Sequence, residues 1–545
     1  MSKKPLAEVL KAIGRQGGFY FSYNSNLIRK DSLVSVSAHG QSVKQVLDGV
    51  LGEQFRYVET DKYVILQPPE KEKWYTISGF ITDGNTGDAL ADVSVFERQQ
   101  LASAITDKEG HFSLQLRDRE KYQSAEIVVS KGFYVDTSVS LIKGYDQELS
   151  LTIVPETYAL PDMVVTQFSG VGRSWFGRKL ISSKLKTQSL NLGKFFVDKP
   201  YQFSFIPGVG THGKMSGQVE NKFSFNLLGG YTAGVDGVEV AGMFNIDKRD
   251  VKYVQAAGVF NVVAGNVEGI QSSGFSNFVV GGLQGVQTAG FMNKADKVEG
   301  VQASGFMNVA ADTLRGVQAA GFMNGAKTAN VQASGFINIA GRVRGAQAAG
   351  FINIADQVDG AQVAGFINIA RRVKGVQVAG FVNVADSSDY PIGIINIIRS
   401  GEKALGVSVD DYGNSFVTLR SGGRVLYGIF GLGGNVSGSS VLAGLEAGIG
   451  AHLPVYRKFR INNEIGAVSL TDARGLFYNE YSVRVMPSIR VGAFELFAGA
   501  GYNVSFYNYK PDGPLVETHI LYSGMAVAQQ MEMRIGYKGG IQVHF

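Results

Sequence analysis

The sequence predicts a mainly β protein: a small α/β domain, then a β-sandwich, then an outer-membrane-type β-barrel that includes a run of repeated strands. Three observations lead to this prediction. Glycine is abundant, with 70 residues in 545 against only 12 prolines, which suits β-structure with tight turns. A unit of about 15 residues recurs through the middle of the chain. The chain ends in an alternating strand whose last residue is Phe545.

The composition narrows the class of protein further. There is no cysteine, which excludes disulfides, thiolate metal sites and cysteine nucleophiles. A net charge of +5 over 545 residues gives no reason to expect nucleic acid as a partner. No apolar run of about 18 residues predicts a membrane-spanning helix. The first residues, MSKKPLAEVL, lack the apolar core and cleavage site of a signal peptide. We interpret the chain as a mature protein without its signal; a cytosolic protein is the alternative.

Residues 1–68 are expected to form the α/β domain. Leu6, Val9, Leu10 and Ile13 have helical spacing, and the segments FYFSY and FRYVETDKYVIL alternate like strands. The order LAEVLKAIGRQGGFYFSYNSNLI, LVSVSAHGQSVKQVLDGVL, FRYVETDKYVIL resembles the STN domain, a periplasmic module of secretins and some TonB-dependent receptors. An unrelated small α/β domain is the alternative.

Residues 75–155 are expected to form the β-sandwich. ISGFITDGNTGDALADVSVF and SAITDKEGHFSLQL each contain strands joined by turns rich in Asp, Gly and Asn. The pieces ISGFITD, TGDAL, ITDKEGHFSL and VVSKGFYV, in this order, resemble the carboxypeptidase regulatory-like domain, a transthyretin-like sandwich. This family is an accessory fold, so the resemblance implies no peptidase activity.

Residues 156–224 are interpreted as a linker followed by the first strands. The segment YALPDMVVT lies where SusC-like TonB-dependent transporters carry an extended segment ahead of their plug domain. The resemblance implies a TonB-box-like segment at Leu160, Pro161, Asp162, Met163, Val164, Val165 and Thr166; a plain linker strand is the alternative. The following residues, QFSGVGRSWFGRKL, do not resemble a plug, which puts ordinary TonB-driven import in doubt.

Residues 225–396 contain the repeat, whose copies include AQVAGFINIA (361–370) and VQVAGFVNVA (376–385). We expect one strand and a polar turn in each unit. Val376, Val378 and Val382 would lie on an apolar face, with Gln377, Phe381 and Asn383 opposite. The recurring aromatic residues are Phe244, Phe260, Phe275, Phe291, Phe306, Phe322, Phe336, Phe351, Phe366 and Phe381. The units resemble the GxQxxGFxN surface repeats of spirochaete and Bacteroidota outer-membrane proteins.

Two architectures fit the repeat. The preferred one places each unit in the barrel wall, with lipid on the apolar face and a polar lumen behind it. The alternative is a β-solenoid beside a smaller barrel, in which the Phe, Asn and Gln of successive units align into ladders. The turns GRVRG (341–345), DQVDG (356–360), RRVKG (371–375) and DSSD (386–389) alternate in sign and do not decide between the two. A barrel would place positive turns on one side of the membrane and negative turns on the other, whereas a solenoid would pair opposite charges between neighbours.

Residues 397–545 are expected to be membrane barrel strands. In the last run, MEMRIGYKGGIQVHF, one face carries Tyr537, Ile541 and Val543. An amphipathic last strand ending in Phe545 resembles the signal by which outer-membrane barrels are recognised for assembly. Such a strand must also pair with the first, because no strand edge can be left open in lipid.

The sequence offers no catalytic, metal-binding or cofactor-binding residues, and we predict that the protein is not an enzyme. The six histidines have no metal-ligand spacing, and Asp410 and Asp411 are interpreted as a solvated turn. The expected location is the outer membrane, with the N-terminal domains in the periplasm. The expected partners are outer-membrane lipid, periplasmic or TonB-system proteins and other outer-membrane proteins. The expected function is that of a channel, a transport component or an envelope scaffold. The alternatives are an adhesive surface protein with a solenoid repeat and a TonB-linked signalling or uptake accessory.

Overall fold

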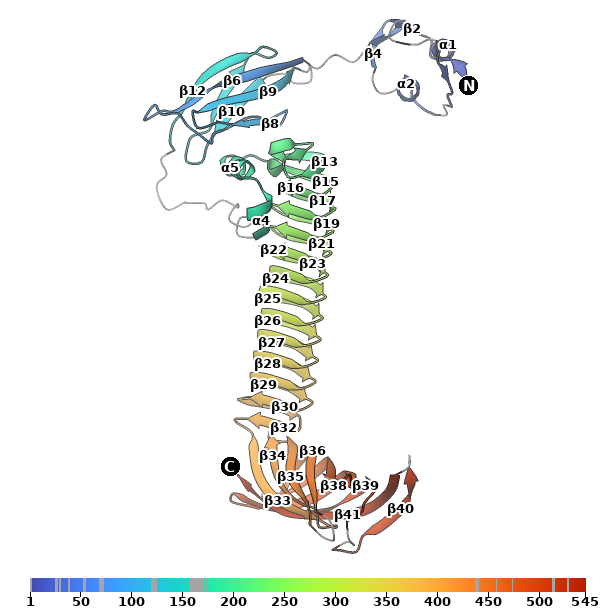
Figure 1. Cartoon of the computed structure of the whole chain (residues 1–545), viewed down its shortest axis with the longest axis vertical. Coiled ribbons are helices and arrows are strands. Elements are labelled where there is room, and N and C mark those ends of the chain that lie inside the picture. The colour runs from blue at the N-terminus through green and yellow to red at the C-terminus, as the bar shows by residue number, and fades with distance from the viewer. Residues whose placement is uncertain are drawn as a thin grey trace.

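The computed structural model describes the chain except residues 1, 25–27, 29–30, 38–39, 52–54, 68–72, 119–124, 157–170, 172–174, 437–440, 457, 473, 512–514 and 527–528. Along the chain come a small α/β unit, a β-sandwich, a long stack of parallel β-coils and a β-barrel (Figure 1). The mainly β class predicted from the sequence is confirmed.

The α/β unit packs two amphipathic helices on short strands. In its first helix Leu6, Val9 and Leu10 share one face and are buried, and the helix ends at Gly18, whose φ of 76° is left-handed. Strand β2 pairs in parallel with β5, which pairs antiparallel with β4. The elements are β1 (Lys4–Pro5), α1 (Leu6–Gly17), β2 (Tyr20–Tyr23), β3 (Leu33–Val34), α2 (Val43–Leu51), β4 (Arg56–Thr60) and β5 (Tyr63–Gln67).

The sandwich consists of two sheets, with strand orders β12-β6-β9 and β11-β10-β7-β8. Alternate residues of β6, among them Tyr75, Ile77 and Ile81, are buried between the sheets, as expected of strands with one covered face. The strands are β6 (Lys73–Asp83), β7 (Ser94–Glu97), β8 (Ala102–Ile105), β9 (His111–Asp118), β10 (Ala125–Ser130), β11 (Thr137–Leu141) and β12 (Gln147–Ile153).

Short helices close the end of the coil stack that faces the sandwich. They are α4 (Trp175–Leu180), α5 (Ser183–Asn191) and the 3₁₀ turn η1 (Gly213–Gln218). Asn191 Nδ2 donates to the carbonyl of Asp92 in the sandwich over 2.7 Å. An apolar cluster spans the same junction; its buried members are Phe96, Val128, Leu192 and Met215. The sandwich is therefore packed directly on the capped end.

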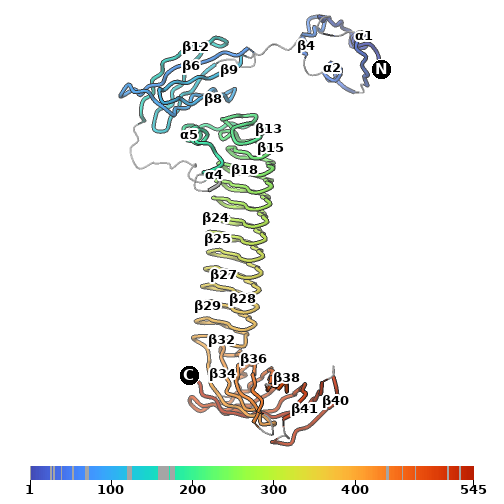
Figure 2. The backbone as a smooth tube through the Cα atoms, in the orientation of Figure 1, coloured from blue at the N-terminus to red at the C-terminus, as the bar shows by residue number. Residues whose placement is uncertain are grey.

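The repeat forms a β-solenoid in which each coil lies on the next, in parallel and in register (Figure 2). Asn338 pairs with Asn353, and Asn353 with Asn368. The parallel pairing already begins at β13 (Val197–Ile206), which pairs with β15. The remaining strands are β14 (Val209–Gly210), β15 (Val219–Asn226), β16 (Gly229–Thr232), β17 (Gly234–Ala241), β18 (Phe244–Asp247), β19 (Val251–Ala257), β20 (Phe260–Val263), β21 (Val267–Ser273), β22 (Ser276–Val279), β23 (Gly282–Ala289), β24 (Met292–Ser304), β25 (Met307–Ala320), β26 (Met323–Ser334), β27 (Ile337–Ala349), β28 (Ile352–Ala364), β29 (Ile367–Ala379), β30 (Val382–Ala385), β31 (Ser387–Ile392) and β32 (Ile395–Ile398).

The solenoid alternative is thus confirmed, and the preferred expectation that the repeat strands continue the barrel is wrong. Up-and-down barrel strands alternate in direction, whereas these coils are parallel, so each side chain lies beside its own counterpart in the next coil. A glycine with positive φ makes the bend possible in most coils. Gly360 has a φ of 140°, and a Cβ there would lie 2.0 Å from the carbonyl oxygen of Gly345.

The barrel closes from eight antiparallel strands, because β41 pairs with both β39 and β33; Leu405 lies opposite Val543. Strand β40 extends past the end of β33 along β41. The strands are β33 (Glu402–Asp410), β34 (Ser415–Gly422), β35 (Leu426–Asn435), β36 (Leu442–Tyr456), β37 (Phe459–Thr471), β38 (Phe477–Val491), β39 (Phe494–Tyr507), β40 (His519–Ala526) and β41 (Gln529–His544).

Candidate functional site

The outer wall of the barrel is apolar. Because successive strand residues alternate between lumen and exterior, the outward positions of each strand carry mostly aliphatic and aromatic side chains, although some apolar residues, such as Phe416 and Leu470, are buried inside. On β33 the outward residues Leu405 and Val407 are 51% and 55% exposed. Ser408, the next residue of the same strand, faces inward and is buried. The other strands repeat this pattern with Leu445, Ile465, Val483, Val485, Leu496 and Tyr502. This wall has the character of a lipid-facing surface.

The closing strand places its predicted residues on that wall. Tyr537, Ile541 and Val543 of β41 are between 39% and 44% exposed, and Phe545 follows the strand at 76% exposed. The alternate residues Arg534, Lys538 and Gln542 point into the lumen and are buried. The two faces therefore divide as the alternation in the sequence indicates. The assembly-signal role of the four outward residues stays a prediction.

The lumen contains a network of buried charges. The guanidinium of Arg534, which is completely buried, donates to the carboxylates of Asp411 and Glu480 and, over 3.2 Å, to the hydroxyl of Tyr478. Asp411 lies 123 residues from Arg534 in the sequence. Since it is only 2% exposed, the interpretation of Asp411 as part of a solvated turn is wrong. A buried carboxylate needs such a cation beside it.

Further ion pairs fill the remaining lumen. Glu446 accepts from Arg484 over 2.7 Å and from Lys538 over 2.5 Å. Arg420 donates to Glu464 over 3.0 Å. The cavity between Asp410, Glu480, Arg484, Asn503 and Lys538 has a volume of only about 10 Å³, at the limit for a single water. The described lumen is therefore packed with side chains.

The interior of the solenoid carries two amide ladders. Asn338 Nδ2 donates to Asn353 Oδ1, which lies 3.0 Å away, and Asn353 Nδ2 to Asn368 Oδ1 at the same distance. Gln362 Nε2 donates to Gln347 Oε1 over 2.9 Å. Each asparagine side chain also donates to a backbone carbonyl of its own coil. Asn353 Nδ2, for example, donates to the Val363 carbonyl over 2.7 Å. The fully buried amides thus satisfy one another.

The exterior of the solenoid carries a stack of aromatic rings. Eight phenylalanines follow one another with ring centroids 4.8–5.3 Å apart and interplanar angles of 1–12°. We call this set the phenylalanine column: Phe275, Phe291, Phe306, Phe322, Phe336, Phe351, Phe366 and Phe381. Phe381 was expected on the amide face, but it lies at the corner of the coil. Phe244 and Phe260 are not members of this column. They align with Ser276, the residue that follows Phe275.

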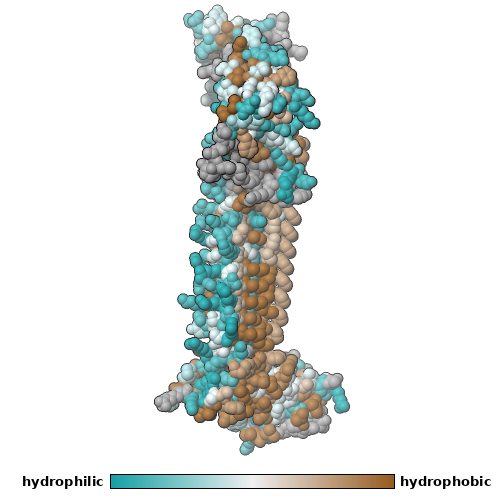
Figure 3. All heavy atoms as spheres, turned by 90° about the vertical axis from the view of Figure 1, so that its left-hand side faces the viewer, coloured by the Kyte–Doolittle hydropathy of each residue, from teal (hydrophilic) through white to brown (hydrophobic). Residues whose placement is uncertain are grey.

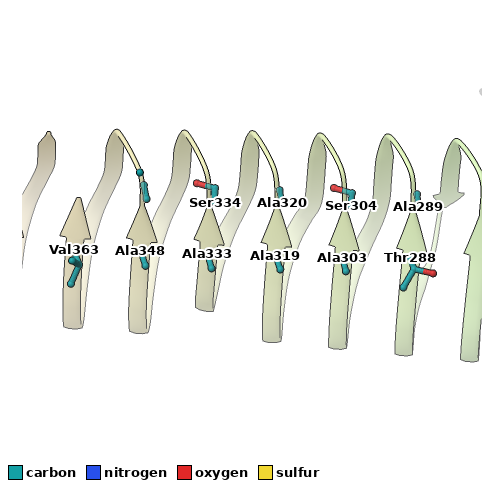
Figure 4. A pocket seen from close by; sticks show the side chains of 12 residues that line it. Thr288, Ala289, Ala303, Ser304, Ala319, Ala320, Ala333, Ser334, Ala348 and Val363 are labelled. Carbon is teal, nitrogen blue, oxygen red and sulfur yellow. The ribbon is translucent and has the colours of Figure 1, made fainter. Parts of the chain in front are cut away.

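Two grooves run along the solenoid. One, of about 810 Å³, is bounded by small side chains such as Ala303, Ala319 and Ala333, which precede the phenylalanines in each coil (Figure 4). The other, of about 730 Å³, follows Ile339, Ile354 and Ile369. Figure 3 shows a continuous apolar band along the rod, with a hydrophilic band beside it. Opposite charges pair between coils on the polar side, where Arg315 lies 2.7 Å from Glu299.

A pair of buried carboxyl groups lies near the capped end. Glu239 takes the place of the ladder glutamine beneath Gln255, whose Nε2 donates to Glu239 Oε2 over 2.7 Å and to Asp247 Oδ2 over 2.6 Å. Burial raises the pKa of both carboxyls; that of Asp247 rises well above its ordinary value, because Glu239 adds its charge nearby. The protonated form of Asp247 is therefore favoured relative to that of an exposed aspartate.

Three remaining points concern the TonB-box-like segment, membrane-spanning helices and metal sites. The TonB-box-like segment, Leu160 to Thr166, lies outside the described residues. Within the part of the chain that the structure describes, no helix is long and apolar enough to cross a membrane. Those same residues contain no group of three or more His, Asp or Glu side chains arranged to hold a metal ion.

The lumen network is the feature that sequence analysis missed, although a signal for it existed. Arg534 and Lys538 lie four apart on one face of the last strand, and Glu480 and Arg484 have the same spacing on β38. Charges at even spacing on an otherwise apolar strand indicate a filled lumen. Their partners, however, come from other strands and cannot be read from spacing.

Comparison with known proteins identifies no family. No protein-family model and no curated protein matches the chain. The minor pilin GBS52 of Streptococcus agalactiae is similar at 13% identity and a TM-score of 0.15, over 20% of this chain and 57% of the pilin. Phospholipase PlaB from Legionella pneumophila is similar at 11% identity and a TM-score of 0.13, over 22% of this chain and 33% of PlaB. The chain thus spans about half or less of these proteins, and TM-scores this low carry no argument.

Proposed function

We propose that the protein is an outer-membrane scaffold: its barrel anchors it in the bilayer, and its solenoid is a rod that holds the sandwich away from the membrane. The observation that carries this proposal is the barrel, with an apolar outer wall and a lumen packed with ion pairs. The 13 residues of β37 extend about 43 Å, and a strand tilted by about 40° would rise about 33 Å. That exceeds the apolar band of about 25 Å typical of such barrels.

The rod has a defined length because its coils repeat without a break. The asparagine ladder makes ten steps from Asn245 to Asn396. At about 4.8 Å for each step, it extends about 48 Å. We assign the two N-terminal domains to the periplasm, where they would contact envelope proteins at this distance from the bilayer. The proposal includes no catalytic step.

The packed lumen favours a scaffold over a channel. An open pore needs a continuous water-filled path, whereas eight-stranded barrels are just wide enough for side chains to fill them. Arg534, Glu480 and Glu446 occupy the centre of this one. We therefore expect the barrel to conduct no ions.

Membrane fractionation and planar-bilayer recording test the proposal together. The full chain should stay with the outer-membrane fraction through high-salt and alkaline washes, and should leave it only with detergent. Once inserted into a planar bilayer it should give no conductance steps. Release without detergent would exclude the membrane anchor. Regular conductance steps would restore the channel hypothesis.

A further inference from the structure

The phenylalanine column ends on the barrel wall. In each coil the residue after the phenylalanine donates its backbone N–H to the phenylalanine carbonyl of the coil before; Val382 does so to Phe366 over 3.0 Å. In the last coil Ile395 donates in the same way to Phe381, also over 3.0 Å, and pairs with Val382. Ile394 therefore occupies the phenylalanine position of the last coil.

Ile394 also belongs to an apolar hollow on the outside of the barrel. This hollow has a volume of about 520 Å³, and Ile394 is its only contribution from the solenoid among the lining residues. The barrel contributes side chains from four neighbouring strands, among them Ile449, Ile465, Val483 and Tyr502. Of these, Ile465 and Val483 are 59% and 55% exposed on the outer wall. The apolar surface of the rod is thus continuous with that of the barrel (Figure 3).

The column faces solvent with a groove along its side. Seven of its eight rings, Phe275 to Phe366, are 37–47% exposed, and Phe381, next to the barrel, is half-buried. So many exposed large apolar side chains in one row are unusual. The adjoining groove passes six coils from Thr288 to Val363, and none of its lining residues is charged (Figure 4). Five steps of about 4.8 Å give a length of about 24 Å. One leaflet of a bilayer core measures about 15 Å, so the groove is long enough for an extended acyl chain.

Because the column repeats from coil to coil, it favours a ligand that needs no single fixed position along the rod. Successive coils repeat the Gly and the Phe, and from Ala303 to Ala349 the groove presents only Ala or Ser at each step, so a folded partner would meet several near-equivalent positions and no unique one. The strand N–H and C=O groups of these coils are paired with the coils above and below, which leaves none for strand addition on this face. A second copy would set one hollow face against another and leave a void between them. A hydrocarbon chain has no register and fills a groove.

We propose that the phenylalanine column and its groove hold the acyl chain of a membrane lipid, which reaches them from the barrel wall past Ile394. This inference rests on the proposed membrane anchor. The barrel wall would be in contact with lipid, and the hollow at Ile394 joins that wall to the column without a polar break. The rod would then offer lipid an apolar path out of the bilayer.

Site-specific fluorescence tests the proposal, since the chain has no cysteine of its own. Ala333→Cys puts a label in the groove, four coils beyond Ile394 and so about 19 Å along the rod. Lys327→Cys puts the matched control on the same coil, at a side chain 76% exposed. Ile465→Cys reports lipid contact at the barrel wall. Each full chain is reconstituted into phosphatidylcholine vesicles whose acyl chains carry bromine, which quenches the label on contact.

We expect bromine to quench the labels at positions 465 and 333 but not the label at 327. Quenching at 465 with equal fluorescence at 333 and 327 would overturn the acyl-chain proposal while leaving the anchor intact. No quenching at 465 would overturn the anchor itself. Energy transfer between labels at position 333 on different chains, in vesicles without bromine, would identify a second copy as the occupant and also overturn it.

A blocking variant gives a second, independent result. Val363 lines the groove between position 333 and the barrel and is 46% exposed, so Val363→Glu should fold while placing a charge in the path. It should abolish quenching at 333 and leave quenching at 465 unchanged. Gln357→Glu, on the polar side of the same coil, is the matched control. Undiminished quenching at 333 in the Val363→Glu chain would contradict a path along the groove.

Discussion

Asn396, the last member of the asparagine ladder, donates its backbone N–H to Ser421 Oγ over 3.0 Å and its Nδ2 to the Ser421 carbonyl over 3.2 Å. Ser421 lies on β34, so the amide ladder of the rod ends on a barrel strand. Asn396 also accepts from Asn383 Nδ2 over 2.8 Å. The rod and the barrel are therefore joined through buried hydrogen bonds as well as through the apolar contact at Ile394.

This joint predicts the effect of Asn396→Ala. The variant leaves Asn383 Nδ2 with only the Ile392 carbonyl as acceptor and the Ser421 carbonyl without its side-chain donor. Each lost bond costs about 1–3 kcal/mol when it leaves a buried group unsatisfied. We expect faster proteolysis between the last coil and β33, with the barrel itself intact. Ser421→Ala keeps the ladder, loses only the bond from the Asn396 N–H and should have a smaller effect. Equal cleavage of wild type and Asn396→Ala would contradict this account.

In the middle of the rod, Asn353→Ala should destabilise several coils at once. It breaks the bonds to Asn338, Asn368 and the Val363 carbonyl, and all these amides are completely buried. Because each coil is supported only by its neighbours, the loss should spread along the stack. We expect the free energy of unfolding of the rod to fall by about 2–4 kcal/mol in urea titrations followed by circular dichroism. Gln357→Ala on the polar side should change it by less than about 0.5 kcal/mol.

Removal of the central lumen cation should destabilise the barrel more than removal of a surface cation. Arg534→Met leaves Asp411 buried without its cation and Glu480 with only Arg484, at 3.9 Å; breaking a buried ion pair typically costs about 3–5 kcal/mol. The loss can be followed by the temperature at which the folded band disappears in semi-native electrophoresis. Arg490→Ala, which removes a cation 36% exposed and 3.6 Å from Glu402, should shift that temperature far less.

Neutral partners should rescue the lumen variant. In the triple variant Arg534→Met, Asp411→Asn, Glu480→Gln, no unpaired charge remains, so most of the lost stability should return. If the triple variant is no more stable than Arg534→Met, packing around the guanidinium matters more than its charge.

The limits of prediction from sequence are clearest at Gly380 and Phe381. Alternation placed Gln377 and Asn383 on one face, and both are indeed buried in the ladders. The same alternation placed Phe381 with them, although it lies at an exterior corner, because period-two reasoning assumes a straight strand. A corner of two residues preserves the alternation on either side and so leaves no trace in it. The choice between barrel and solenoid depended on strand direction, which periodicity does not encode.

The ion pairs between distant strands could not be predicted from the sequence either. Asp410, Asp411, Tyr412 and Gly413 have the composition of an exposed turn, and the turn itself is present. Asp411 is nevertheless buried because Arg534, from the closing strand, reaches it across the lumen. Closure of the barrel creates that contact, and no local pattern records it.

The buried carboxyl pair near the cap predicts a pH-dependent stability. The folded pKa of Asp247 is raised, so the pair favours the folded state at low pH, and this contribution is lost as the pH rises from about 4 through the raised value. Wild-type stability should therefore decrease as the pH rises above about 4 and through the raised pKa of Asp247. Calorimetry of the purified chain at several pH values measures this decrease in stability.

Asp247→Asn should remove much of that decrease, because an amide donates to Glu239 as the protonated acid does but carries no titrating proton. At pH 8 we expect it to be more stable than wild type by about 1–3 kcal/mol. Asp236→Asn is the matched control: Asp236 is 45% exposed and faces Lys252 at 3.9 Å, so its substitution should leave the pH profile unchanged. A steep pH profile retained by Asp247→Asn would place the titrating group elsewhere.

The terminal residue provides a prediction that separates assembly from stability. Phe545 is 76% exposed beyond the end of β41, so Phe545→Ser should alter the stability of the folded barrel by no more than about 0.5 kcal/mol. If it belongs to an assembly signal, the same variant should accumulate less folded barrel in cells. Phe494→Ser is the control, because Phe494 is 56% exposed on the same wall and lies opposite Val543. Equal folded yields from the two variants would show that Phe545 acts only as one more apolar residue of the wall. A lower yield for Phe545→Ser alone, with unchanged unfolding of the purified barrel, would assign Phe545 to assembly.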